Sequence, residues 1–210
     1  MITVHTEHIG SLLRPAELLK ARVELDRRSL TPREFQAIED AAVEHVLSLQ
    51  HQAGCEVVTD GEYRRVSFQS VLVEGTEGLG EWDLETFLWG DWYGDGLEPW
   101  HRPRPESLGV AGKLVRKRHR AVEEFQYVRD RTDRIVKVTL PSPSLLANFW
   151  SAERSKPVYP TLETFLDDVA LLVKSEVSEL ARLGCEYVQL DAPHYPLLLD
   201  EKTRSFYQRQ

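Results

Sequence analysis

Two segments of the sequence carry acidic side chains directly after a short apolar run, and the second also carries an imidazole: TDGEYRR (59–65) and QLDAPHY (189–195). The first holds Asp60 and Glu62, and the second holds Asp191 and His194. Carboxylates that face a cavity can bind the ammonium group of an amino acid, or accept hydrogen bonds from the N–H groups of a heterocycle. These side chains are therefore candidates for binding a small molecule of that kind.

Two further segments with polar ends, HIGS (8–11) and TLPSPS (139–144), also follow predicted strands. The first offers backbone N–H groups near Gly10 and Ser11, together with the imidazole of His8. No segment matches a glycine-rich phosphate-binding loop or the G-x-S-x-G turn of a nucleophilic serine. We therefore expect neither a phosphate cradle nor a serine nucleophile of that type.

Helix signals precede both acidic segments. Thr31, Pro32 and Glu34 form a capping box that starts an amphipathic helix, and Gly54 is expected to end it. A second amphipathic helix is predicted over 161–183, and it ends at the glycine of a second Gly-Cys-Glu sequence. Shorter helices are predicted over 16–25 and 121–131.

Short, β-branched apolar runs between the helices indicate buried parallel strands. Strands are predicted at 2–9, 57–58, 134–144 and 186–191. Strands that alternate with helices predict an α/β architecture with a parallel sheet. In such folds the loops after the strands gather on one face, so the four polar segments are expected to converge there.

Residues 74–109 interrupt this alternation, because they are rich in Gly, Trp, Pro and acidic residues and have no helical period. With the strand predicted over 109–119, they suggest an insertion over 74–118 that forms a β-rich hairpin arm. The rest of the chain is expected to form one domain that spans residues 1–210.

The formal net charge of -8 argues against nucleic acid or an anionic membrane as a partner, because such binders need a basic face. No run of roughly 18 apolar residues predicts a membrane span. The N-terminus lacks a signal-peptide pattern, and the chain has two cysteines. A reducing cytoplasm is the predicted location.

In this order, TEHIGSLLRP, VVTDGEYRR, LPSPSLL and GCEYVQLDAPHY resemble the catalytic barrel of cobalamin-independent methionine synthases, and in particular their shorter single-barrel members. The resemblance implies a TIM-type (β/α)8 barrel, of which this chain would cover about the first four βα units. It implies substrate contacts for homocysteine and a methylated folate at Ile9, Gly10, Ser11, Glu62, Trp150 and Asp191. Asp60 and His194 lie at the same strand ends and complete the expected substrate-binding set.

The resemblance further implies methyl transfer from 5-methyltetrahydrofolate to the thiol of homocysteine, with zinc as the cofactor. Zinc coordination deprotonates a thiol and presents a nucleophilic thiolate. The resemblance implies a zinc held by a His-x-Cys pair, a further acid or cysteine, and a late cysteine. This sequence has no His-x-Cys pair, and Cys55 and Cys185 are predicted core residues. We expect no zinc ligands, no assignable catalytic residue and no methyltransferase activity in this chain alone. A second copy or a separate C-terminal half would complete the barrel.

Three other interpretations stay open. The same fold could act on another thiol such as coenzyme M, or take its methyl group from a corrinoid. Uroporphyrinogen decarboxylase has a similar fold, and Arg14, Arg64 and Arg65 could supply the cationic pocket that it needs, although the strand-end acids argue against this. The chain could also be an inactive half-barrel that serves as a binding or dimerisation module, although it keeps Glu62 and Asp191.

Overall fold

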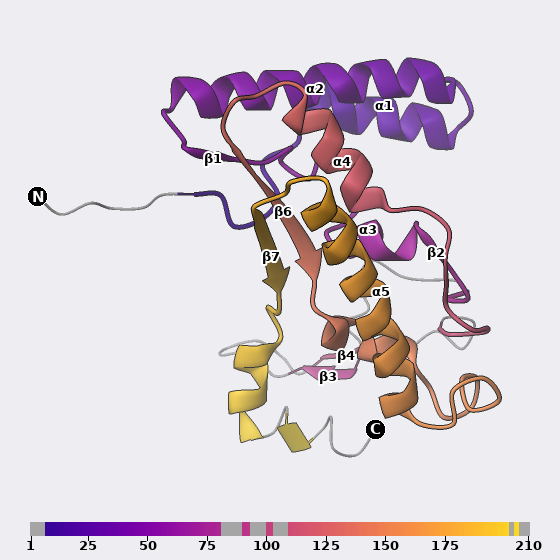
Figure 1. Ribbon diagram of the computed structural model, residues 1–210. Coiled ribbons are helices and arrows are strands. Elements are labelled where there is room, and N and C mark those ends of the chain that lie inside the picture. The colour runs from indigo at the N-terminus through magenta and orange to yellow at the C-terminus, as the bar shows by residue number, and fades with distance from the viewer. Residues whose placement is uncertain (1–6, 81–89, 93–99, 103–108, 202–203, 206–210) are drawn as a thin grey trace, which may run out of the picture. The chain divides into compact units, whose positions relative to one another are not determined.

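The computed structural model describes residues 7–80, 90–92, 100–102, 109–201 and 204–205 (Figure 1). The chain divides into two compact units, of which the first comprises residues 1–71, 119–140 and 176–189, and the second comprises 72–118, 141–175 and 190–210. The expectation of one domain over 1–210 stays a prediction. No helix among the described residues is long and apolar enough to cross a lipid bilayer.

Two helices, α1 (Ala16–Asp26) and α2 (Pro32–Gln52), pack against each other in the first unit (Figure 1). The predicted capping box starts α2: Thr31 Oγ1 accepts the Glu34 N–H at 3.3 Å, and Glu34 Oε2 accepts the Thr31 N–H at 2.9 Å. Gly54 follows the helix with φ 75°, a conformation that glycine adopts without steric cost. Both predicted ends of this helix are confirmed.

The central element of the fold is a three-stranded sheet with the order β1–β6–β7. The strand β1 (Val57–Val58) pairs in parallel with β6 (Ile135–Pro141), so that Val57 lies opposite Ile135. On its other side, β6 neighbours β7 (Tyr187–Asp191). Residues 136–141 are all buried, as expected for the middle strand of a parallel sheet. The predicted α/β class is confirmed at this level.

Helix α4 (Arg120–Arg129) precedes β6, and α5 (Leu162–Arg182) precedes β7. In the first unit, the fully buried carboxylate of Glu176 accepts the Ala121 N–H at 2.9 Å and lies 2.8 Å from His119 Nδ1. The first N–H groups of a helix have no partner within it, so this carboxylate satisfies one of them. A buried acid on α5 thus anchors the start of α4.

The strand predicted at 2–9 is wrong for residues 7–9, which have no regular secondary structure; residues 1–6 lie outside the described residues. Side chains hold this segment instead. Lys137 Nζ donates to the carbonyl oxygen of His8, and Gln189 Nε2 donates to that of Ile9 at 2.7 Å. β-branched residues favour a strand, but they do not show whether its carbonyl groups accept hydrogen bonds from a neighbouring strand or, as here, from side chains. The number of βα units stays a prediction.

Antiparallel strands occupy the predicted insertion in the second unit. There β2 (Thr76–Glu77) pairs with β5 (Val115–Arg116), and β3 (Gly90–Trp92) pairs with β4 (Trp100–Arg102). The strand predicted over 109–119 is shortened to β5, and residues 81–89, 93–99 and 103–108 lie outside the described residues. Short helices are α3 (Ser70–Val73), η2 (Pro143–Phe149) and η3 (Tyr195–Leu199).

Gly78→Ala is expected to destabilise the second unit strongly. Gly78 has φ 98°, and an added Cβ would lie 2.3 Å from the carbonyl oxygen of Lys113. The N–H groups of Ala111 and Gly112 both donate to the Gly78 carbonyl at 3.0 Å. These hydrogen bonds hold the segment after β2 against the segment before β5, so the added Cβ cannot be relieved by moving them apart. We expect the free energy of unfolding, measured by urea denaturation, to fall by about 3 kcal/mol. Gly112→Ala is the control, because its added Cβ meets its nearest atom at 3.6 Å; equal losses would contradict the prediction.

Candidate functional site

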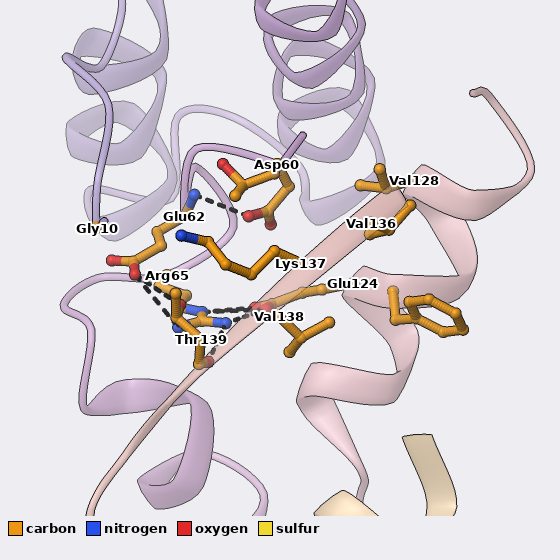
Figure 2. Close-up of a pocket in the computed structure, with 12 residues that line it drawn as sticks. Gly10, Asp60, Glu62, Arg65, Glu124, Val128, Val136, Lys137, Val138 and Thr139 are labelled. Atoms are coloured by element: carbon orange, nitrogen blue, oxygen red, sulfur yellow. Dashed lines mark hydrogen bonds and ion pairs between the residues drawn. The ribbon is translucent and has the colours of Figure 1, made fainter. Parts of the chain in front are cut away.

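A pocket in the first unit lies between the 59–65 segment, α4 and β6 (Figure 2). Its lining carries an unusual number of charged side chains, namely Asp60, Glu62, Arg65, Glu124 and Lys137. All five are buried. Buried charges need partners, so the contacts of each group decide which of them is available to a ligand.

The carboxylate of Glu62 is held on both oxygens. Its Oε1 accepts a hydrogen bond from Thr139 Oγ1 at 2.7 Å and lies 3.6 Å from Arg65 Nη1. Its Oε2 accepts a hydrogen bond from Ser11 Oγ. The backbone at Glu62 has φ 59°, and its N–H donates to Asp60 Oδ1 at 2.8 Å. A non-glycine residue at positive φ is strained, so these contacts maintain the turn that directs the carboxylate into the pocket.

Only one of the two carboxylate oxygens of Asp60 accepts a hydrogen bond from the described residues. Oδ1 accepts the Glu62 N–H, whereas Oδ2 is buried and has no hydrogen-bond partner in the part of the chain that the structure describes. An unpaired buried oxygen costs free energy unless a ligand or water supplies a donor. Asp60 lines the pocket and keeps one carboxylate oxygen that a ligand or water could satisfy.

The N-terminal segment reaches this turn through its backbone and one hydroxyl. Gly10 lines the pocket, Ser11 donates to the Glu62 carboxylate, and the Leu12 N–H donates to the Gly61 carbonyl at 3.1 Å. The side chain of Ile9 is 74% exposed and does not line the pocket. The structure thus joins the predicted residues 10 and 11 with the two acids of the 59–65 segment, and their role in binding stays a prediction.

The guanidinium of Arg65 is neutralised by Glu124 from α4. Nη2 lies 2.7 Å from Glu124 Oε2, and Nε lies 3.2 and 3.0 Å from the two carboxylate oxygens. Burial by itself lowers the pKa of Arg65, but the charge and hydrogen bonds of Glu124, together with the charges of Asp60 and Glu62, outweigh it and raise that pKa. Burial raises the pKa of Glu124 to about 7, against the opposing charge of Arg65. Most of the Arg65 charge is thus taken up by Glu124, while its Nη1 also lies 3.6 Å from Glu62 Oε1.

Lys137 is neutralised in a similar way. Its Nζ lies 3.3 Å from Glu7 Oε2 and 3.0 Å from Gln189 Oε1, and it also donates to the His8 carbonyl. With the charges of Lys137 and Arg65 both matched, Asp60 and Glu62 leave the pocket with an excess of negative charge. A cationic or N–H-rich group is the ligand that this arrangement favours.

Glu124→Gln is expected to change how stability depends on pH. The folded protein binds the Glu124 proton more tightly than the unfolded chain, because the pKa is raised from 4.5 to about 7. The contribution of this group to the free energy of unfolding therefore decreases as the pH rises from about 4.5 to about 7. The variant lacks this decrease, which is on the order of 3 kcal/mol. Urea denaturation across this window measures it, and parallel curves for the two proteins would contradict the prediction.

Trp150 and Asp191, two of the predicted site residues, each form a hydrogen bond with a main-chain group in the second unit. The Trp150 indole N–H donates to the Tyr159 carbonyl at 3.0 Å. Asp191 ends β7 as predicted, and its main-chain carbonyl accepts the Ser142 N–H at 2.9 Å. Both side chains are half-buried. Their roles in substrate binding stay predictions.

His194 belongs to a polar cluster in the second unit. Its Nε2 lies 3.0 Å from Ser144 Oγ, and its ring packs edge-on against Tyr195 with 4.8 Å between centroids. Burial lowers the pKa of His194 and so favours the neutral imidazole. A neutral ring can serve either as donor or as acceptor to the hydroxyl. Its expected contact with substrate stays a prediction.

The residues that sequence reasoning missed are Thr139, Glu124 and Lys137, and Arg65 was considered only for a different activity. The one signal for the two charged residues was charge within an apolar context: Lys137 stands inside a strand that is otherwise largely apolar, and Glu124 lies on the buried face of α4. A buried charge in such a run indicates a partner, although it does not say which residue that partner is.

Among the described residues, no group of three or more His, Cys, Asp or Glu side chains lies close enough together to hold a metal ion. Cys55 and Cys185 are half-buried free thiols rather than the core residues that were predicted. Cys55 Sγ lies 3.9 Å from His8 Nε2. The described side chains therefore do not fit the zinc site that the family resemblance implies.

Comparison with known proteins gives one family. Residues 3–208 match the family model described as "Cobalamin-independent synthase, Catalytic domain". The chain is 29% identical over 201 residues to the uncharacterized protein YxjH of Bacillus subtilis, covering 94% of this chain and 50% of the relative. It is 30% identical over 190 residues to the methionine synthase of Pyrococcus abyssi, covering 90% of this chain and 51% of the relative. The chain thus spans about half the length of these two curated relatives.

Solved structures agree in fold. A putative vitamin-B12 independent methionine synthase from Listeria monocytogenes matches with a TM-score of 0.68 at 21% identity, over 98% of this chain and 59% of that one. A B12-independent methionine synthase from Shewanella, solved in complex with selenomethionine, matches with a TM-score of 0.60 at 22% identity, over 83% of this chain and 47% of that one. At this level of identity the likeness establishes the fold alone.

Proposed function

Because the chain belongs to the catalytic-domain family of cobalamin-independent synthases, we propose that its first unit binds the amino-acid part of homocysteine for methyl transfer to the thiol. The family resemblance seen in the four sequence segments is confirmed. Methionine would be the product of that transfer.

The observation that carries this proposal is the pair of acids in the pocket. Asp60 Oδ2 is buried and has no hydrogen-bond partner among the described residues, and Glu62 is oriented beside it by Ser11 and Thr139. An α-ammonium group has three N–H donors and one positive charge, so it can satisfy Asp60 and compensate Glu62 together. Gly10 and Ser11 lie at the same pocket and would contact the rest of the amino-acid part, as the family pattern implies.

The same acids separate homocysteine from other thiols. Coenzyme M carries a sulfonate, which would meet two carboxylates whose charge is offset only in part, because Arg65 also pairs with Glu124 and Lys137 pairs with Glu7. A polycarboxylate porphyrin would be repelled for the same reason. The excess of negative charge therefore favours a thiol that carries an ammonium group.

A methylated folate donor, a zinc cofactor and a cytoplasmic location complete the proposal. When bound, zinc would supply a deprotonated thiol. The described residues offer no ligand set for it, so no step is assigned to the metal here. We propose that a separate C-terminal half supplies its ligands, that such a half or a second copy of this chain completes the barrel, and that the chain alone binds substrate without turning it over. Asp191, His194 and Trp150 lie in the second unit and remain candidate substrate-binding residues there.

Calorimetric titration of the 210-residue chain with L-methionine tests the proposal. Methionine is the suitable probe because it needs no metal-bound thiolate. Methylthiopropionate, which lacks the ammonium group, is the matched ligand, and we expect it to bind at least about 10-fold more weakly. Failure of methionine to bind, or equal affinity for both ligands, would refute the proposal. Added zinc is expected to change neither affinity, because the described residues offer no ligand set for it.

A further inference from the structure

We infer that Thr139, Arg65 and Glu124 form a positioning relay that holds the Glu62 carboxylate in its ligand-facing orientation. Thr139 and Glu124 were not expected as site residues, Arg65 was expected only for the cationic pocket of another activity, and none of the three needs to touch the ligand. The consequence for ligand binding rests on the proposed function, whereas the relay itself can be tested without any ligand.

The direction of the relay follows from the number of hydroxyl protons. Thr139 Oγ1 accepts a hydrogen bond from Arg65 Nη1 at 3.0 Å and lies 2.7 Å from Glu62 Oε1 (Figure 2). A guanidinium N–H can only donate, and a hydroxyl has one proton to give. The Thr139 proton must therefore point to Glu62, which makes threonine a donor to an ionised carboxylate.

Arg65 also fixes the position of Thr139 itself. Its Nη2 donates to the Thr139 carbonyl oxygen at 2.9 Å, and its Nη1 donates to the Thr139 hydroxyl. One planar guanidinium therefore hydrogen-bonds both oxygen atoms of that residue. The fork geometry of a guanidinium allows this double contact, and a lysine ammonium could not reproduce it together with the bidentate pair to Glu124. The strand β6 supplies the rigid frame on which Thr139 stands.

Glu124 fixes Arg65 in turn. The pair is fully enclosed, with Arg65 2% and Glu124 4% exposed. The charged groups that act on this pair are Asp60 and Glu62 on the turn, and Arg120 on α4. Without Glu124, the guanidinium would be free to turn toward the two pocket acids and neutralise the charge that a ligand is expected to use. Glu124 thus keeps Arg65 directed at Thr139 and away from direct bidentate pairing with Glu62.

A double-mutant cycle in the ligand-free chain tests the relay. Thr139→Val keeps the side-chain shape and removes the hydroxyl, and we expect it to raise the equilibrium constant for unfolding about 10-fold or more. In a Glu62→Gln background the same change is expected to raise it about 3-fold or less, because the charged acceptor is already absent. Equal effects in both backgrounds would overturn the relay.

The functional consequence is read from L-methionine binding by the same variants. Thr139→Val is expected to lower methionine affinity about 10-fold, with no matching loss for methylthiopropionate. Thr139→Ser keeps the donor and is expected to stay within about 3-fold of the wild type. A serine variant as weak as the valine variant would overturn the relay. If the wild type binds no methionine, the proposed function is wrong, while the double-mutant cycle still decides the relay.

Discussion

Glu62→Gln is expected to weaken L-methionine binding by about 100-fold. This loss is larger than the roughly 10-fold loss expected for Thr139→Val. The Glu62→Gln change keeps the size of the side chain and removes its charge. The amide would also place an NH2 donor against the hydroxyl of Ser11 or Thr139, each of which now donates to the carboxylate. Calorimetric titration of the purified variant measures the loss.

Glu56→Gln is the matched control for this experiment. Glu56 lies in the same unit, directly before β1, and its side chain is exposed. It should bind methionine as the wild type does, because an exposed surface charge has little influence on a buried pocket. Unchanged affinity in Glu62→Gln, with a normal thermal transition, would show that the ligand does not use this carboxylate.

Arg65→Met is expected to lower the free energy of unfolding by about 3–5 kcal/mol. The substitution keeps the volume of the stem and leaves Glu124 buried without its cation. It also removes the donors to both oxygens of Thr139. The double variant Arg65→Met/Glu124→Leu is expected to recover a large part of the loss, because replacing both members of a buried ion pair avoids an isolated charge. Urea denaturation of the three proteins measures both effects.

Arg131→Met provides the control for Arg65→Met. Arg131 pairs with Glu44 at 3.0 Å, but both side chains are substantially exposed, at 37% and 57%. Exposed pairs of this kind contribute roughly 0–1 kcal/mol. A loss in Arg65→Met no larger than that of Arg131→Met would contradict the structural importance of the buried pair. Failure of the double variant to recover any stability would instead assign the loss to the contacts with Thr139.

Local features of the sequence determined most of the helices and their ends. The capping box at Thr31 and Glu34 and the turn at Gly54 involve residues a few positions apart, so their geometry depends little on the rest of the chain. The order of four strand-end segments also identified the family, and it drew attention to the turn that holds Asp60 and Glu62. In contrast, the strand expected at 2–9 depended on a pairing partner, and residues 7–9 are held by Lys137 and Gln189 instead.

The partners of the pocket residues were decided only by the tertiary structure. Ser11 is 51 positions from Glu62, Thr139 is 77 positions from it, and Glu124 is 59 positions from Arg65. No local rule relates residues at such separations, because each pairing requires the parallel register of β1 and β6 and the placement of α4 beside them. The sequence by itself pointed to Asp60 and Glu62, which line the pocket, but not to Glu124. The fold decided which of them is neutralised, which is oriented and which keeps an oxygen for a ligand, since burial and donor geometry exist only once the strands have assembled.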